Sequence, residues 1–303
     1  MKKDILTLWD LTPEDFKYLF ERAIQLKSEK KNGVFSNILS GRTLGLVFDK
    51  PSTRTRISFE AAMAQMGGTP IFINTRDSQI SRNEPVRDTA RVLSRYLDAL
   101  VIRTFSQDLL IEFAEFSSIP VINALTDLYH PCQVLSDLMT VIELKGGYRG
   151  FKIAWIGDGN NVAHSWINAA AILGFHLELA CPKGYTPNEK ILKRAMASGK
   201  GTIRTSEDPI AVAKDAGVIY TDVWASMGQE REHAFRKKTF KPYCVDEELI
   251  SHASTDVTVM HCLPAHRGEE IGEAVLEGPH SAVWDQSENK LHMHKAILET
   301  LIR

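Results

Sequence analysis

The sequence has few cysteines, no long apolar run and no excess of basic residues. Its four cysteines are widely spaced and form no C-x-x-C pair, so neither a disulfide framework nor a zinc or redox motif of that spacing is indicated. Free thiols are typical of reducing compartments, and we expect a cytoplasmic protein. No apolar stretch reaches the ~20 residues that span a bilayer. Asp4 and Asp10 interrupt the basic start of the chain, which argues against a secretory signal.

The charge balance argues against a nucleic-acid partner. Lysine and arginine total 36 against 38 acidic residues, for a net charge of -2, whereas nucleic-acid binders usually carry a basic surplus. The 303 residues contain no tandem repeat or low-complexity segment, and they suffice for two domains of ordinary size. We therefore expect small-molecule ligands, with no nucleic-acid or membrane partner.

Short apolar runs alternate with helical patterns, which predicts parallel β-sheets joined by right-handed crossovers. In the first half the expected strands are 44–48, 71–73, 99–102 and 121–122. In the second half they are 152–156, 177–180, 202–204, 218–220, 257–260 and 282–284. A helix over 131–145 stops at Gly146-Gly147, a common helix terminator. The fold class is therefore α/β with two domains, 1–147 and 148–303, each a parallel sheet flanked by helices.

The segment from Ser52 to Arg56 follows the first expected strand and begins a helix. A helix start offers free N–H groups and a positive dipole end, which suit an anion. The hydroxyls of Ser52, Thr53 and Thr55 add donors, and Arg54 adds a fork that can grip phosphate oxygens. A plain N-cap by Ser52 with exposed arginines is the alternative, but capping needs only one such residue.

Two further groups follow strands of the first half. Arg103 comes directly after a strand and could supply a second positive charge, or form a surface or interdomain salt bridge. His130 and Gln133 begin the helix after the fourth strand and share a face. They could polarise a carbonyl oxygen and bind an adjacent amino group, or simply cap the helix and face solvent.

The strand ends of the second half are also polar. Gly157-x-Gly159 lacks the third glycine of a dinucleotide motif, because residue 162 is valine. Asn161 could offer an amide to a ligand or occupy a turn, and Asp222 could bind an ammonium group or cap a segment. Cys262 follows a buried strand and could be reactive or an inert core thiol. We predict no metal site.

Together these motifs resemble the ornithine carbamoyltransferases. The resemblance covers essentially the whole chain and rests on Ser52-Thr53-Arg54-Thr55-Arg56, His130-Pro131-x-Gln133, Asp222 with Ser226-Met227-Gly228, and His261-Cys262-Leu263-Pro264. The first two motifs are common to carbamoyltransferases, and the last two are typical of the ornithine branch.

The resemblance implies roles for individual residues. A carbamoyl phosphate site is expected from Ser52, Thr53, Arg54, Thr55, Gln79, Arg103, His130, Gln133, Cys262, Leu263 and Lys290. An ornithine site is expected from Asn161, Asp222, Ser226 and Met227. Cys262, Arg103 and His130 are the expected catalytic residues. Lys290 stands where the family usually has arginine, so it keeps the charge without the bidentate fork, and we expect it still to contact carbamoyl phosphate.

The resemblance also implies the reaction and the assembly. The side-chain amine of L-ornithine would attack carbamoyl phosphate, giving L-citrulline and phosphate in arginine metabolism, with no cofactor. The final helix, about 288–303, would return to the first domain. A homotrimer or an assembly of trimers is expected, with Gln79 reaching a neighbouring subunit's phosphate site.

Other functions remain open at this point. Within the family, putrescine, an acylated ornithine or aspartate could be the acceptor, although Ser226-Met227-Gly228 favours ornithine. A nicotinamide-linked oxidoreductase would need the incomplete glycine motif. A ligand-binding protein without activity would use the same strand ends but would not need Cys262 or His130.

Overall fold

The computed structural model describes residues 4–75, 84–225 and 232–302. The chain divides into two compact units, Met1–Met139 with Glu288–Arg303, and Thr140–Ser287. Two long helices pass from one unit into the other. They are α5 (Pro131–Lys145) and α12 (Val283–Ile302).

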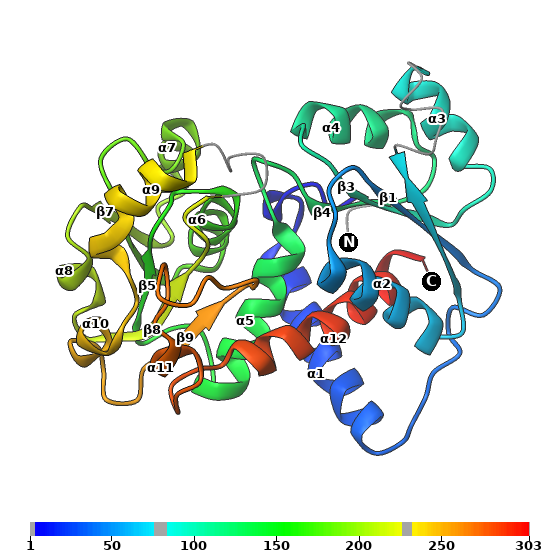
Figure 1. Ribbon diagram of the computed structural model, residues 1–303. Helices are drawn as coiled ribbons and strands as arrows, with labels where there is room; N and C mark the ends of the chain where they lie inside the picture. Colours follow the sequence, from blue (N-terminus) through cyan, green and yellow to red (C-terminus); the bar gives the residue numbers. More distant parts are fainter. Residues whose placement is uncertain (1–3, 76–83, 226–231, 303) are drawn as a thin grey trace. The chain divides into compact units, whose positions relative to one another are not determined.

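The first unit is built on a four-stranded parallel sheet in the order β2-β1-β3-β4. Its strands are β1 (Thr43–Phe48), β2 (Thr69–Asn74), β3 (Ala99–Arg103) and β4 (Val121–Leu125). Its helices besides α5 and α12 are η1 (Leu8–Asp10), α1 (Pro13–Lys31), α2 (Thr53–Gln65), α3 (Val86–Leu93) and α4 (Gln107–Phe116). In Figure 1, α3 and α4 lie on one side of this sheet, and α1, α2 and α12 lie on the other.

Apolar and capping residues explain these elements. Leu100 and Ile102 alternate along β3 and pack with Leu110 and Phe113 of α4 in one buried cluster, as expected for a strand facing a helix. Helix α1 begins with Thr12 in a capping box and Pro13 in its first turn, a typical helix start. The first unit therefore follows from local sequence patterns.

The C-terminal helix α12 packs on the first unit, as expected from the resemblance. Arg22 of α1 forms an ion pair with Glu299 at 2.9 Å. His294 stacks on Phe59 of α2, with the ring centroids 3.6 Å apart. These contacts place α12 beside the helix that begins at Thr53.

The second unit holds a five-stranded parallel sheet in the order β7-β6-β5-β8-β9. Its strands are β5 (Lys152–Ile156), β6 (His176–Ala180), β7 (Thr202–Ser206), β8 (Ala216–Thr221) and β9 (Thr258–His261). Its helices are α6 (Asn161–Leu173), α7 (Glu189–Ala197), α8 (Pro209–Ala213), α9 (His233–Phe240), η5 (Lys241–Tyr243), α10 (Glu247–Ser251) and α11 (Glu273–Leu276). Trp155 of β5 stacks on Tyr220 of β8 in its core.

The expected strand 282–284 is wrong. Val283 and Trp284 form the first turn of α12, which begins five residues earlier than the expected 288. Only an isolated bridge between Val259 and Ser281 adjoins β9 there. A short apolar run has the same pattern in a strand and in a buried helix, so its length could not separate the two. Lys290 lies on this helix, as the expected helix from about 288 already implied.

The glycines of Gly157-x-Gly159 have a structural explanation. Gly157 has a φ of 134°, which side-chain-bearing residues rarely adopt. A Cβ atom on Gly159 would lie 2.3 Å from the backbone nitrogen of Pro187. Both positions need glycine for the path of the backbone, without any dinucleotide.

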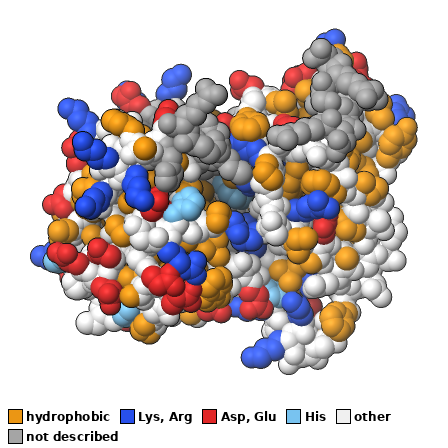
Figure 2. Space-filling view, viewed as in Figure 1, with side chains coloured by type: hydrophobic (Ala, Val, Ile, Leu, Met, Phe, Trp, Pro, Cys, Tyr) orange, Lys and Arg blue, Asp and Glu red, His pale blue; other side chains and the backbone are white. Residues whose placement is uncertain are grey.

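The surface carries charges of both signs. Figure 2 shows basic and acidic side chains interspersed over the face in view. Across the described residues, no helix combines the length and the apolar character needed to cross a membrane.

Candidate active site

Each sheet has one point where its strand order reverses, and such points are the usual ligand sites of parallel α/β folds. In the first unit the reversal lies between β1 and β3, and in the second it lies between β5 and β8. In the first unit the loop after β1 carries the Ser52 motif, and Arg103 is the last residue of β3. In the second unit the loops after β5 and β8 carry Asn160 and Asp222.

Ser52 is the N-cap of α2, and its hydroxyl accepts a hydrogen bond from the Thr55 N–H at 3.3 Å. The capping role that the sequence left open is therefore present. It engages only one N–H group of the first turn, and the positive end of α2 still faces the carboxyl edge of the sheet. Capping and anion binding are compatible here.

Arg54 and Arg103 lie at this helix start. Arg103 ends β3 opposite Phe48 of β1, and its carbonyl accepts from the Asp49 N–H at 2.8 Å. Its side chain is buried. Arg54 is half-buried and, among the described residues, has neither a hydrogen bond nor an ion pair. A half-buried guanidinium with no protein partner is suited to an anionic ligand.

Lys290 reaches the same place from α12. Its ammonium donates to Gln133 Oε1 at 2.9 Å and to Thr55 Oγ1 at 3.2 Å. Gln133 in turn donates through Nε2 to Asp137 Oδ1 at 2.8 Å. All four side chains are buried, so this is a hydrogen-bonded network within the first unit and not a surface contact.

His130 precedes α5 and is buried near this network. Burial is the main cause that lowers its pKa well below the ordinary value, and the charges of Lys290 and Arg103 lower the pKa further. The imidazole is therefore neutral at physiological pH and offers one N–H donor. A neutral donor beside two cations can stabilise negative charge that develops on a carbonyl oxygen.

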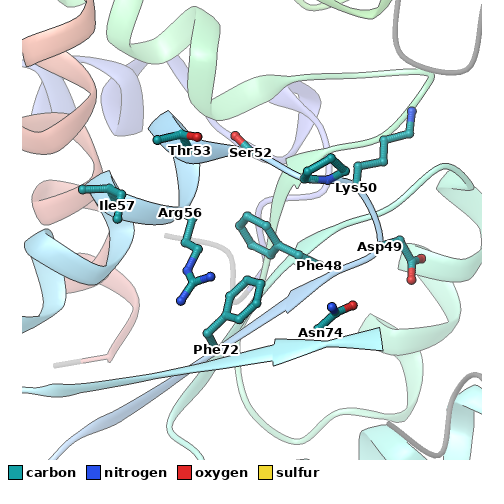
Figure 3. Close-up of a pocket in the computed structure, with 10 residues that line it drawn as sticks. Phe48, Asp49, Lys50, Ser52, Thr53, Arg56, Ile57, Phe72 and Asn74 are labelled. Carbon is teal, nitrogen blue, oxygen red and sulfur yellow. The ribbon is translucent and has the colours of Figure 1, made fainter. Parts of the chain in front are cut away.

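A pocket of about 460 Å³ opens next to the Ser52 loop. It is lined by Phe48, Asp49, Lys50, Pro51, Ser52, Thr53, Arg56, Ile57, Phe72 and Asn74. Figure 3 shows Arg56 directed toward Phe72, and its guanidinium carbon lies 3.6 Å from the ring centroid. Arg56 also pairs with Glu60 at 2.9 Å, so protein groups already engage it.

Asp222 is the centre of the site in the second unit. The Cys262 thiol donates to its Oδ1 at 2.9 Å, and Asn160 Nδ2 donates to its Oδ2 at 2.7 Å. The Val223 N–H also donates to Oδ1, at 2.8 Å. Asp222 is therefore a buried acceptor held in one orientation, which can receive an ammonium group.

Asn161 and Leu263 flank this centre. Asn161 is the first residue of α6, while Asn160 caps that helix through its side chain. Leu263 has a φ of 58°, in the left-handed region that a residue with a branched side chain rarely adopts. Its N–H donates to His261 Nδ1 at 2.8 Å. Strained backbone of this kind is often found at functional sites.

Two groups of side chains in the second unit could hold a metal ion. One ligand atom from each of Asp222, His261 and Cys262 lies within 4.8 Å of the others. The same is true of His266, Glu269 and Glu270. Neither group was expected, because neither has a recognised metal-binding spacing in the sequence.

The structure thus gathers the expected residues into two clusters, one in each unit. Ser52, Thr53, Arg54, Thr55, Arg103, His130, Gln133 and Lys290 lie in the first unit, and Asn161, Asp222, Cys262 and Leu263 lie in the second. Gln79, Ser226 and Met227 fall outside the described residues.

Sequence reasoning missed Asp137 and Asn160. The spacing of four between Gln133 and Asp137 on a helix was a signal, because such residues face each other. Asn160 was considered only with its neighbour as a ligand amide or a turn. Its preference for N-cap positions was the signal for its place at α6.

The fold and its two clusters define an α/β enzyme with a cluster of cations and hydroxyls in one unit and a cluster around a buried carboxylate in the other. Residues 3–143 match the family of carbamoyl-P binding domains of aspartate/ornithine carbamoyltransferases. Residues 149–301 match the Asp/Orn binding domain of the same family. The chain belongs to the aspartate/ornithine carbamoyltransferase family.

Individual relatives agree with this assignment. The chain is 56% identical to the ornithine carbamoyltransferase of Syntrophus aciditrophicus, and all of both chains is covered. It is 52% identical to that of Geobacter sulfurreducens, also with full coverage of both. Among solved structures, the ornithine carbamoyltransferase of Pyrococcus furiosus matches with a TM-score of 0.95, 48% identity and coverage of 99% of this chain and 97% of that one.

Proposed function

We infer that the chain transfers the carbamoyl group of carbamoyl phosphate to the side-chain amine of L-ornithine, giving L-citrulline and phosphate. The observation that carries this proposal is the unpartnered Arg54 at the start of α2, beside buried Arg103 and neutral His130. The two arginines can bind a phosphate, and the neutral histidine can donate to a carbonyl oxygen joined to it. The full-length similarity to ornithine carbamoyltransferases supports the choice of substrates.

In the first unit, Ser52, Thr53, Arg54 and Thr55 hold the phosphate of the substrate. Arg103, His130 and Thr55 donate to the carbonyl oxygen as it becomes an oxyanion, and preorganised donors of this kind lower the barrier. The leaving phosphate takes up negative charge next to Arg54, and it is the acceptor for the proton of the attacking amine.

In the second unit, Asp222 and Asn161 bind the amino-acid end of ornithine, together with Ser226 and Met227. The attacking side-chain amine must be neutral, although an amine of lysine type titrates near pH 10 in water. Burial and nearby positive charge favour its deprotonation. Cys262, whose thiol donates to Asp222, orients and partly desolvates the amine without forming a covalent bond to it.

A citrulline assay tests the proposal. The purified enzyme is supplied with carbamoyl phosphate and, in parallel, with ornithine, putrescine or aspartate. Ornithine should be the best acceptor by kcat/KM. A better rate with putrescine would overturn the substrate assignment, and inertness toward carbamoyl phosphate combined with ligand binding would make the chain a binding protein.

Assembly and location are further parts of the proposal. We propose a homotrimer whose phosphate site is completed by Gln79 of a neighbouring subunit, as the family resemblance implies. We also propose the cytoplasm, because Cys132, Cys181, Cys244 and Cys262 are all free thiols and reducing compartments keep thiols in that state.

A further inference from the structure

Gln133 lies between a hydrogen-bond donor and a hydrogen-bond acceptor inside the first unit. Lys290 Nζ donates to its Oε1 at 2.9 Å, and its Nε2 donates to Asp137 Oδ1 at 2.8 Å. Gln133 is 1% exposed and Asp137 is fully buried. Both ends of the carboxamide are therefore held by protein groups of opposite hydrogen-bonding character.

This arrangement fixes which end of the amide faces which way. An amide oxygen and nitrogen are hard to tell apart by position alone, so their assignment depends on the partners. An ammonium group can only donate, and a carboxylate can only accept. Lys290 and Asp137 therefore require the same orientation independently of each other, and reversing the amide would set donor against donor and acceptor against acceptor.

The hydrogen bonds of the Thr55 hydroxyl also have a fixed direction. Its hydroxyl oxygen accepts from Lys290 at 3.2 Å, so its own proton is directed elsewhere. Among the described residues, no acceptor takes that proton. Gln133 Oε1 likewise keeps a second lone pair after the bond from Lys290. The network thus leaves one outward donor, on Thr55, and one outward acceptor, on Gln133.

We propose that Asp137 is a positioning residue that makes this site select a carbamoyl group over an acyl group; the inference rests on the proposed function. A carbamoyl group offers both a carbonyl acceptor and an NH2 donor, which match Thr55 and Gln133. An acetyl group has a methyl in place of NH2, so it would leave the second lone pair of Gln133 Oε1 desolvated and without a donor. A site discriminates strongly against a ligand that leaves one of its buried polar groups without a hydrogen-bond partner.

Asp137 is needed for this even though Lys290 favours the same orientation. A lysine side chain is long and flexible, and the family resemblance implies that the Lys290 ammonium also contacts carbamoyl phosphate. Asp137 lies one helical turn from Gln133 on α5, so it stays in place whatever Lys290 does. It holds the amide when the ammonium turns to the ligand.

Acetyl phosphate, tested as a competitive inhibitor against carbamoyl phosphate, measures the discrimination. The quantity is the ratio of the Ki of acetyl phosphate to the KM of carbamoyl phosphate at saturating ornithine. In Asp137→Leu the ratio should fall roughly tenfold, which corresponds to one hydrogen bond of ordinary strength. Asp137→Asn keeps an acceptor oxygen and should keep the ratio within about threefold of the original.

Ser136→Ala is the matched control, because Ser136 is as buried as Asp137 on the same helix and its hydroxyl donates to the Cys132 carbonyl at 2.8 Å. It should leave the ratio unchanged. A merely structural role for Asp137 would weaken both ligands together and leave the ratio as it was. If Asp137→Leu does not fold, as judged by circular dichroism, Asp137→Ala takes its place.

An unchanged ratio in Asp137→Leu or Asp137→Ala overturns the inference. An equal loss in Asp137→Asn and Asp137→Leu also overturns it, because the acceptor would then not be the cause. Absence of citrulline with the unmodified enzyme would instead refute the proposed function, so the two failures are distinguishable.

Discussion

Arg54 and Arg56 stand two residues apart in one motif, yet their surroundings differ. Arg56 pairs with Glu60 and lies over the ring of Phe72. Arg54 has no such partner in the part of the chain that the structure describes. The sequence motif does not distinguish the two arginines. Their contacts do, because of the two only Arg54 lacks a partner among the described residues that would compete with an external anion.

Replacing these two arginines in turn tests that assignment. Arg54→Met should raise the KM of carbamoyl phosphate about 100-fold, because two charge-assisted bonds to phosphate contribute about 3 kcal/mol. Arg56→Met should change it by less than about fivefold, since an exposed ion pair contributes little. Steady-state kinetics at saturating ornithine would measure both. Equal losses would place both arginines on the phosphate.

Buried neighbours could not be found from single residues in the sequence. The hydroxyl and arginine donors at 52–56 were predicted, because a polar run after an apolar strand is visible locally. The network around Gln133 was not, because Gln133 joins its helix neighbour Asp137 to Lys290, which lies 157 positions away on another helix. What the sequence hides is long-range pairing, which depends on how the elements pack.

At the scale of elements, the start of α6 joins a structural role to a functional one. Asn160 accepts hydrogen bonds from the N–H groups of Val162 and Ala163, and it donates to Asp222 at 2.7 Å. Asn188 caps α7 in a comparable way through the Lys190 N–H but has no contact with Asp222 among the hydrogen bonds of the described residues. The two caps form a matched pair.

Asn160→Ala and Asn188→Ala should each destabilise the protein by about 1 kcal/mol, which is typical for loss of an N-cap. Only Asn160→Ala should also raise the KM of ornithine, by roughly tenfold, because Asp222 loses the donor that orients it. Urea unfolding and steady-state kinetics would measure the two effects. An unchanged ornithine KM in Asn160→Ala would contradict the positioning role.

Another element contact has a pH dependence with an unusual sign. Asp158, in the loop after β5, pairs with Arg236 of α9 at 3.0 Å. Burial nevertheless raises the pKa of Asp158 from 3.8 to about 6, since desolvation outweighs the attraction of Arg236. The protonated carboxyl is therefore favoured in the folded state more than in the unfolded chain.

The stability that Asp158 contributes should thus be fully present below pH ~4 and lost as the pH rises through about 6. The free energy of unfolding of the native protein minus that of Asp158→Asn should fall by roughly 3 kcal/mol over this range. Urea unfolding of both proteins at several pH values would measure it. A difference that grows with pH would mean that the ion pair with Arg236 outweighs burial.

Element boundaries show where sequence patterns reach their limit. The helix 131–145 was predicted with the bounds it has, because Pro131 and Gly146 mark both ends. The run Ala282-Val283-Trp284 was assigned to a strand, but Val283 and Trp284 form the start of α12. It has no glycine or proline at its end, and three apolar residues are too few to separate a period of 2 from one of 3.6.

At the scale of the whole molecule, the same arrangement of a strand-order reversal and polar loops occurs in both units. In each unit the strand order reverses next to the first strand, β1 or β5, and the loops beside the reversal carry the polar groups. The first unit supplies cations and donors, and the second supplies the carboxylate of Asp222. A donor substrate with a phosphate and an acceptor substrate with an ammonium group thus each meet a unit that carries the opposite charge. A transferase of these two substrates therefore needs both units.

The proposed trimer leads to a prediction about mixed subunits. If Gln79 serves the phosphate site of its neighbour, Gln79→Ala and Arg54→Met should each inactivate a trimer made of one variant only. In mixed trimers, a Gln79→Ala subunit with intact Arg54 can meet a neighbour with intact Gln79. With equal mixing, about a quarter of the sites should then be complete.

Subunits of the two variants would be mixed by mild denaturation and renaturation, and citrulline production would be compared before and after. Recovery toward about a quarter of the native activity is expected for sites shared between subunits. Native subunits carried through the same procedure control for losses, and each variant renatured alone controls for reactivation. If Gln79 acted within its own subunit, every mixed site would lack one of the two groups, and mixing would restore nothing.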